Sequence, residues 1–372
     1  MDETVGKGAW RLLWLPPTLP YYAPPEGPFA DPAAAELTKR LVFSCWKVVP
    51  KAVATLLSYE AERRMILALQ PTAVNTPEAR KRRRPLLRFA RSDGRLTGMS
   101  LSPLIYPSVA LAEIVDPLAL GAANGRRTSA EVLDAAEQIV AERLGRLSVP
   151  VDPLAGAAED EAWYWAGPIL LDLAADRAGT RRWWSRDDLA DEWAKGASEA
   201  LAGDQDEALE DGETRWDDHV EEARRLVEGT LQLGRRPADL ARVLAEIALA
   251  APATAALRAL TRQTCGADAD ARDRVRLDAA RIGRAFLTLF NQPEAMALIR
   301  SINGEEPYWR RALEYALAGN LQATLDEYVH ILKDDLGLPD APPARVSEVI
   351  ADKVVAVLAL RTANVGVDDI RP

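Results

Sequence analysis

Apolar residues recur at helical spacing along most of the chain, and the first clear case follows Val49. From there every fourth position is apolar: Val53, Leu57, Ala61, Met65 and Leu69. This period predicts a helix over Val49 to Leu69 that packs one stripe against a neighbouring layer, because residues i and i+4 share a helix face. The charged residues between them are expected to point outward: Glu60, Glu62, Arg63 and Arg64.

The residues before this helix favour a buried strand. Leu41, Val42 and Phe43 form a short apolar run entered through basic residues. Such a run followed by a helix is typical of one strand-helix unit of a parallel sheet. Further on, the alternation from Leu86 to Arg91 and the turn at 92–94 predict a short hairpin.

Beyond about residue 110 the pattern is almost entirely helical. Helix starts are indicated by the capping box Thr128-Ser129-Ala130-Glu131, by Ser185, by Pro237 and by Pro293. The best-defined helices are expected over Asp217 to Leu233, Pro237 to Ala250, Asp273 to Phe290, Tyr308 to Leu317, Leu321 to Leu332 and Val346 to Leu360. Short turns between them favour a bundle of antiparallel neighbours over residues 160–360.

The predicted fold class is therefore mostly α, with a partial α/β element near the N-terminus and a large helical bundle inserted into it. The chain has 372 residues, enough for two domains. We expect a proline-rich lead-in over residues 1–36, a partial lobe with a basic loop over residues 37–115, and an α-helical domain over residues 116–372.

Composition narrows the classes of function. The net charge of −10 opposes general attraction to nucleic acid, so any such contact must be local. The two cysteines, Cys45 and Cys265, lack metal-ligand spacing and are expected to be buried thiols. Neither a run of eighteen uncharged apolar residues nor a secretory signal is present, which predicts a soluble cytoplasmic protein without a membrane span.

One segment resembles a known family. The sequence from Arg40 to Met65, RLVFSCWKVVPKAVATLLSYEAERRM, is similar to the start of the second RecA-like lobe in superfamily-two helicases and Swi/Snf-type translocases, where this strand and its exit carry motif IV. The segments 10–22, 96–108 and 360–365 also look like parts of such proteins. The resemblance implies a parent protein that uses ATP and Mg²⁺ to move along nucleic acid, and it covers about the first third of the chain.

The motifs of a complete motor are missing. Val5-Gly6-Lys7-Gly8 lacks the first glycine and the hydroxyl residue of a phosphate-binding loop, and we expect a flexible terminus there. Residues 191–194 resemble the acidic motif that binds Mg²⁺, but they lie in a helical pattern instead of following a buried strand. Residues 232–236 are one residue out of register with the arginine motif Q-x-x-G-R-x-x-R. We therefore interpret Gly234 as the end of a helix. We therefore predict no catalytic residues and no ATP hydrolysis by this chain alone.

Two groups of residues are candidates for nucleic-acid contact. By the resemblance, Ser44 and Lys47 at the strand exit would position a phosphate. The basic run Arg80, Lys81, Arg82, Arg83 and Arg84 could clamp phosphates through several contacts. The alternatives are that Ser44 merely ends a strand, that Lys47 is solvated and that the basic run is a solvated loop tip.

Other chemistry finds little support. Glu327 and His330 have the spacing of a di-iron bundle, but His219 has Trp216 at the required carboxylate position, so no metal site is predicted. Five tryptophans are expected to pack in the core rather than stack on bases: Trp163, Trp165, Trp183, Trp184 and Trp193.

The sequence thus favours a helicase-related protein without a complete ATPase site, whose expected partners are a nucleic acid, namely DNA, and a complementary chain that carries the missing lobe. The alternative is a mostly helical protein-interaction module without motor activity. Both would need no cofactor in this chain alone.

Overall fold

The computed structural model of the chain describes residues 5–24, 26–35, 37, 44–46, 48–69, 85–89, 91–92, 95–122, 127–148, 158–195, 209–301 and 305–358. This part of the chain is mostly helical, as predicted. The strands in it are the two-residue β1 (Arg91–Ser92) and β2 (Arg95–Leu96), which pair antiparallel as a hairpin. The predicted strand at residues 41–43 lies outside the described residues.

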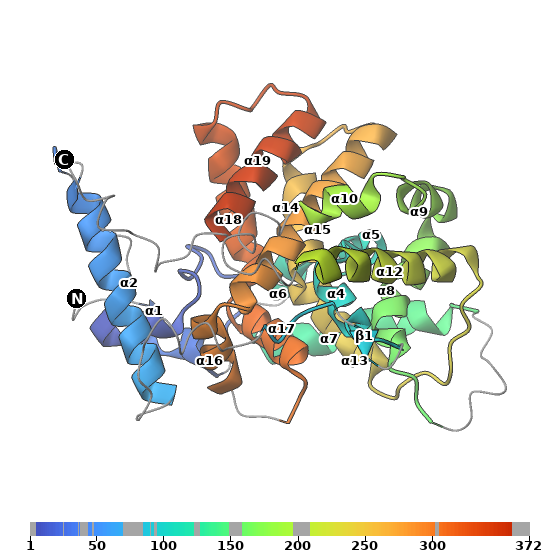
Figure 1. Ribbon diagram of the computed structural model, residues 1–372, viewed down its shortest axis with the longest axis horizontal. Coiled ribbons are helices and arrows are strands. Elements are labelled where there is room, and N and C mark those ends of the chain that lie inside the picture. Colours follow the sequence, from blue (N-terminus) through green and yellow to red (C-terminus); the bar gives the residue numbers. More distant parts are fainter. Residues whose placement is uncertain are drawn as a thin grey trace.

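The helices, with short 3₁₀ turns among them, follow one another through the described parts of the chain (Figure 1). They are η1 (Val5–Lys7), η2 (Ala9–Arg11), η3 (Pro28–Ala30), α1 (Pro32–Ala35), α2 (Val48–Leu69), η4 (Met99–Leu101), α4 (Ser102–Ile105), α5 (Val109–Ile114), α6 (Pro117–Ala122), α7 (Ser129–Gly145), α8 (Ala162–Ala175), α9 (Arg177–Trp184), α10 (Leu189–Ala194), α12 (Leu209–Glu228), α13 (Leu240–Ala250), α14 (Pro252–Gln263), α15 (Ala269–Phe290), α16 (Pro293–Ser301), α17 (Tyr308–Ala318), α18 (Leu321–Asp335) and α19 (Pro343–Leu358).

The centre of the molecule is formed by α13, α14 and α15. α14 packs against α15 and α18, α13 against α7 and α17, and α15 also against α19. Small residues permit this close approach: a Cβ atom at Gly283 of α15 would lie 2.6 Å from the Cβ of Ala253 on α14. Every residue from Ala251 to Leu260 is buried, so this part of α14 is surrounded by other elements on all its faces.

The N-terminal segment runs across the start of α18 and is held there by hydrogen bonds. The indole Nε1 of Trp14 donates to the carbonyl of Gly319 at 2.9 Å, and the Tyr22 hydroxyl donates to that of Leu317 at 2.9 Å. Asn320 has a left-handed backbone (φ 49°), and its Oδ1 accepts the N–H of Tyr21 at 2.9 Å. An asparagine tolerates that conformation better than most residues, which explains its place at this crossing.

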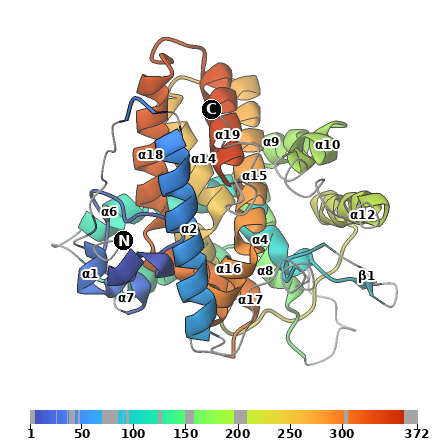
Figure 2. The ribbon, with the colours of Figure 1, turned by 60° about the vertical axis from the view of Figure 1, so that its left-hand side comes forward.

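α2 lies at the opposite end of the molecule from α9 and α12 (Figure 1). It packs against α16 and η2, and a rotated view brings it to the front of the ribbon (Figure 2). Met65, a member of the predicted stripe, is buried, whereas Leu56 and Tyr59 are more than half exposed, at 58% and 56%. The helix is therefore covered on one side only.

Several predicted boundaries are confirmed. The Thr128–Glu131 capping box is present at the start of α7, and Pro293 begins α16. α15, α17, α18 and α19 match their predicted ranges within a few residues.

Three local predictions are wrong. Ser185 ends α9 instead of opening a helix, and Asp188 precedes α10. α12 ends at Glu228, because Gly229 takes a positive φ of 83° and provides the stop that we had placed at Gly234. Val5 is buried in η1 rather than part of a flexible terminus.

No described helix is by itself long and apolar enough to cross a membrane. Two pairs of consecutive helices meet that length and composition only when taken together, and each is bent: Met99–Ile105 with Val109–Ala122 by 49°, and Leu240–Ala250 with Pro252–Gln263 by 47°.

Candidate functional site: arginines and aromatic rings along α15

The charged chemistry of the molecule is concentrated on α15. The helix begins after Asp268, whose Oδ1 accepts the N–H of Ala271 at 2.8 Å. Four of its five arginines, Arg274, Arg276, Arg281 and Arg284, then lie along a helix that is otherwise largely buried. Burying a guanidinium costs several kcal/mol unless an anion and hydrogen-bond acceptors compensate, so the surroundings of each arginine show what it does.

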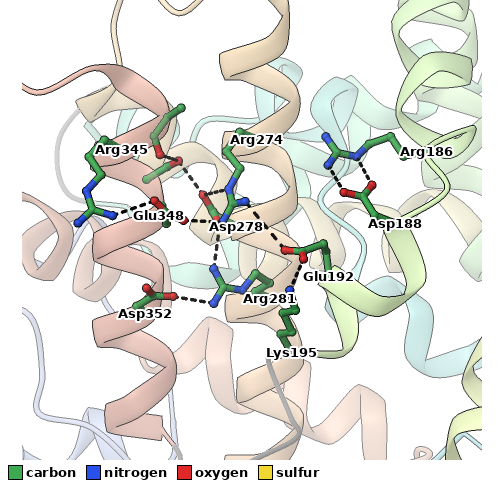
Figure 3. Close-up of polar contacts among 12 residues, drawn as sticks. Arg186, Asp188, Glu192, Lys195, Arg274, Asp278, Arg281, Arg345, Glu348 and Asp352 are labelled. Carbon is green, nitrogen blue, oxygen red and sulfur yellow. Dashed lines mark hydrogen bonds and ion pairs between the residues drawn. The ribbon is translucent and has the colours of Figure 1, made fainter.

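The first group of side chains joins α15 to α19 and α10 (Figure 3). Asp278 is fully buried and accepts hydrogen bonds from Arg274 at 3.1 Å, Arg281 at 3.0 Å and the Ser347 hydroxyl at 2.8 Å. Burial raises the pKa of the Asp278 carboxyl, and its hydrogen-bond donors act in the opposite direction. Both oxygens of the Asp278 carboxylate therefore accept hydrogen bonds, and the residue connects α15 with α19.

The same group extends to the surface. Arg281 also reaches Asp352 of α19 at 2.6 Å, and Arg274 lies 3.5 Å from Glu348 of α19 and 4.0 Å from Glu192 of α10. Figure 3 shows that Arg274 and Arg281 flank Asp278 and reach outward to the carboxylates of the other two helices. Alternating charges of this kind fix the relative positions of the helices.

Arg276 forms a second, fully enclosed group. Its Nη2 lies 2.5 Å from Oδ2 of Asp172 on α8, and its Nε donates to the carbonyl of Pro107 at 3.1 Å. Asp172 also accepts the Ser108 hydroxyl at 2.8 Å and the Tyr106 hydroxyl at 2.6 Å. The guanidinium carbon stands 4.5 Å from the ring centre of Trp183. Every charge here is matched, which indicates a structural role.

Arg284 differs from the other three. Its Nε and Nη1 atoms are buried and have no hydrogen-bond partner within the part of the chain that the structure describes. The guanidinium carbon stands 4.2 Å from the ring centre of Trp216 on α12 and 5.8 Å from that of Phe89. Burial lowers the pKa of Arg284 to about 10. The side chain remains a cation at neutral pH, but nothing in its described surroundings neutralises it.

The aromatic box around Arg284 is built by three segments. Phe89 and Trp216 pack edge to face at 4.9 Å, and the His219 ring lies 5.0 Å from Phe89. Gly98, just after β2, permits this arrangement, because a Cβ there would lie 2.9 Å from the Cα of Phe89 and 3.1 Å from Nε2 of His219. Trp193 packs against Trp216 at 5.0 Å and also has a buried indole N–H without an acceptor among the described residues.

The predicted nucleic-acid residues are only partly placed. Ser44 is exposed, and its hydroxyl accepts the backbone N–H of Trp46 at 3.1 Å, a local turn contact. Lys47 and the basic run from Arg80 to Arg84 lie outside the described residues. Their role in nucleic-acid binding stays a prediction.

The other candidates take structural positions. All five tryptophans expected in the core are buried, as predicted. Glu327 accepts two hydrogen bonds from Thr18, at 2.7 and 2.8 Å, and His330 is exposed and lies 3.9 Å from Asp334. No group of three or more metal-ligating side chains occurs within the described ranges. The cysteine prediction is wrong, because Cys45 and Cys265 are both exposed.

Comparison with known proteins adds no relative: no protein-family model matches the chain, and searches of curated proteins and of solved structures find no match. The argument for function therefore stands on the residues themselves. Arg284 could not be identified from the sequence, because the sequence of an arginine-rich helix does not show which arginine has a hydrogen-bond acceptor and which has none. Only the packing of α12 and the 85–98 segment against α15 makes it distinct.

Proposed function

We propose that this chain is part of an ATP-dependent nucleic-acid translocase related to superfamily-two helicases, and that α2 belongs to its second RecA-like lobe. The observation that carries the proposal is an apolar stripe on the outer face of α2. Leu56, Tyr59 and Leu67 share one helix face and are 58%, 56% and 42% exposed. A row of large exposed apolar side chains marks a contact surface.

The composition of α2 supports a position between two layers. Its stripe through Val53, Leu57 and Met65 faces the molecule, and the stripe through Leu56 and Tyr59 faces outward. The ion pair between Arg63 and Glu60, at 2.7 Å, lies on the same outer face, so the exposed apolar side chains of this face are interleaved with charges, as at a partly polar contact surface. The resemblance of residues 40–65 to the motif IV region supplies the second layer, a parallel sheet that would include residues 41–43.

The catalytic parts of such a motor would come from elsewhere. A complementary segment or chain with a phosphate-binding loop would bind ATP and Mg²⁺, and this chain would contribute nucleic-acid contacts through Ser44, Lys47 and the basic run from Arg80 to Arg84. Phosphate contacts of this type position nucleic acid without reading its sequence. A cytoplasmic location is part of the same proposal.

The alternative function is a helical protein-interaction module without motor activity. The observation in its favour is the core around α13, α14 and α15, which the described helices enclose without a contribution from a sheet among the described residues. In that case the outer stripe of α2 would bind a partner protein unrelated to a motor.

One experiment distinguishes the two functions: the segment that carries the missing motor motifs is identified and then co-expressed with this chain. The genomic sequence on both sides of this chain is read for a phosphate-binding loop upstream and a Q-x-x-G-R-x-x-R motif downstream, and the corresponding protein is co-expressed with the chain. We expect no ATP turnover by the chain alone, and a complex with Mg²⁺-dependent ATPase activity. Leu56→Asp with Tyr59→Asp should abolish the complex, whereas Leu19→Asp, at a 77% exposed position of the lead-in, should not.

Two results would contradict the proposal. ATP turnover by the chain alone that disappears when one of its residues is changed would show a complete site. Flanking sequence without either motor motif, together with no association, would favour the interaction module.

A nucleic-acid measurement tests the basic run independently. We expect weak binding that falls steeply with salt, because few phosphate contacts must overcome a net charge of −10. Binding should be lost in the triple variant Arg82→Ala, Arg83→Ala, Arg84→Ala. Tight binding at physiological salt that survives this change would place the contact surface elsewhere.

A further inference from the structure

Residues 11–22, which we call the strap, run across the end of α17 and the start of α18. Side chains of the helical body bind the strap through its backbone. The Tyr315 hydroxyl of α17 accepts the N–H of Leu13 at 2.7 Å and donates to the carbonyl of Arg11 at 3.0 Å. One phenol group thus bonds to both kinds of backbone group on the strap, whatever side chains these residues carry.

Asn320, just before α18, binds the other end of the strap. Its Oδ1 accepts the N–H groups of Tyr21 at 2.9 Å and Tyr22 at 3.3 Å, and its Nδ2 donates to the carbonyl of Tyr22 at 3.1 Å. An amide side chain offers a donor and an acceptor side by side, which is what an extended peptide needs from its receptor. Between the two ends, Glu327 of α18 accepts the N–H of Thr18 at 2.7 Å.

The side chains of the strap bind the backbone of the body in return. The indole of Trp14 donates to the carbonyl of Gly319, and the Tyr22 hydroxyl donates to that of Leu317. Both carbonyls lie at the C-terminal end of α17, where they have no acceptor role further along the helix. The Trp14 ring lies 5.3 Å from the Tyr315 ring, and a Cβ at Gly319 would stand 2.6 Å from it. The corner between the two helices therefore has a fitted place for an indole.

The strap contributes little to the core. Tyr22 is its one buried residue, and Leu19 is 77% exposed. A hydrogen bond contributes only about 0.5–1.5 kcal/mol to stability, and segments with few buried apolar contacts open locally while the rest of a protein stays folded. Three prolines, Pro16, Pro17 and Pro20, restrict the strap backbone and lower the entropy cost of binding again. The strap can therefore leave the corner and return to it.

We propose that the corner formed by the end of α17 and the start of α18 is a binding site for an extended aromatic peptide, and that the strap occupies it as an exchangeable ligand in cis. The strap itself defines the ligand class: an extended backbone with an indole, as at Trp14, and two phenol rings further along, as at Tyr21 and Tyr22. A peptide of this class in trans competes with the strap, so the strap is an autoinhibitory segment. The site does not rest on the motor proposal.

The test uses a fluorescent synthetic peptide with the sequence of residues 9–24 and follows its binding to the full chain by anisotropy. The unaltered protein should bind it weakly, because its own strap fills the site. Trp14→Ala loosens the strap and should raise the apparent affinity at least about tenfold, since that affinity is reduced by the fraction of molecules whose site is closed. Leu19→Ala, at an exposed strap position, should bind like the unaltered protein.

A second substitution separates recognition from backbone shape. Glycine at position 320 keeps the left-handed conformation of Asn320 but removes every side-chain hydrogen bond to the strap. Peptide binding should therefore be lost when Asn320→Gly is added to Trp14→Ala. If Trp14→Ala does not fold, Tyr22→Phe takes its place, because it keeps the buried ring and removes only the hydroxyl bond to Leu317.

Hydrogen exchange of the unaltered chain gives an independent readout. We expect the amides of Leu13, Tyr21 and Tyr22 to exchange through local opening, and faster than those of α14. A folded Trp14→Ala or Tyr22→Phe variant that binds no peptide would overturn the proposal. Peptide binding that survives Asn320→Gly, or strap amides that exchange only with global unfolding, would also overturn it.

Discussion

α14 and α2 are both rich in apolar residues, yet they lie in opposite environments. All residues of α14 up to Leu260 are buried, whereas Met65 is the one buried residue among the α2 side chains that the structure describes. α14 has α13, α15 and α18 around it, while α2 rests on α16 and η2 and has Leu56 and Tyr59 more than half exposed on its other face. The difference shows that an apolar stripe predicts which face of a helix is suited to burial, but not which element covers that face.

The largest effect on the free energy of unfolding is expected at the buried ion pair of Asp172 with Arg276. Asp172→Ala should lower the free energy of unfolding by about 3–5 kcal/mol, because it leaves Arg276 buried without its anion. Chemical denaturation measures the change. Arg182→Ala is the control: it breaks an ion pair with Asp273 in which the arginine is half exposed, and it should cost at most about 1 kcal/mol. Equal losses in the two variants would show that the enclosed pair is not special.

A matched pair of leucines tests the comparison of the two helices directly. Leu260→Ala on α14 should cost about 2–5 kcal/mol, since it removes a fully buried side chain and leaves a cavity. Leu56→Ala on α2 should change the free energy of unfolding by less than about 0.5 kcal/mol. A large loss at Leu56, measured by the same denaturant titration, would mean that its face is already covered.

A smaller loss in the free energy of unfolding is expected for a substitution where α14 and α15 cross. Gly283→Ala should cost about 1–3 kcal/mol, because the added Cβ would press on Ala253 and on the Cα of Ile105 at 3.1 Å. Gly145→Ala at the end of α7 meets nothing within 4 Å and should be neutral or slightly stabilising. If both substitutions had the same effect in thermal unfolding, the close crossing would not be needed.

The smallest expected effect is at a helix start. Thr128→Ala removes the hydroxyl that accepts the N–H of Glu131 in the α7 capping box and should cost about 1 kcal/mol. Thr128→Ser, which keeps a hydroxyl, should recover most of the loss. A loss that serine does not recover would point to packing of the threonine methyl group rather than to capping.

The sequence predicted most of what depends on local chemistry. The capping box at Thr128, the start of α16 at Pro293 and the extent of α17 follow from signals within a few residues. The end of α12 was misplaced because two glycines, Gly229 and Gly234, carry the same signal, and only the positive φ of Gly229 decides between them.

The candidate site could not be predicted in the same way. The box around Arg284 joins residues from the 85–98 segment, α12 and α15, which are far apart in the chain. The lack of a hydrogen-bond acceptor among the described residues is a property of how these segments pack. Nothing in the run of arginines from Arg274 to Arg284 distinguishes the paired ones from the unpaired one.

Hydrogen exchange of the backbone amides of α2 and α14 in the same sample tests the central claim most directly, namely that the described residues enclose α14 but leave the outer face of α2 exposed. We predict that α14 exchanges only through global unfolding, whereas α2 opens with a free energy close to zero and loses its protection first. Protection of α2 equal to that of α14 would show that its partner is already present, and would contradict the account.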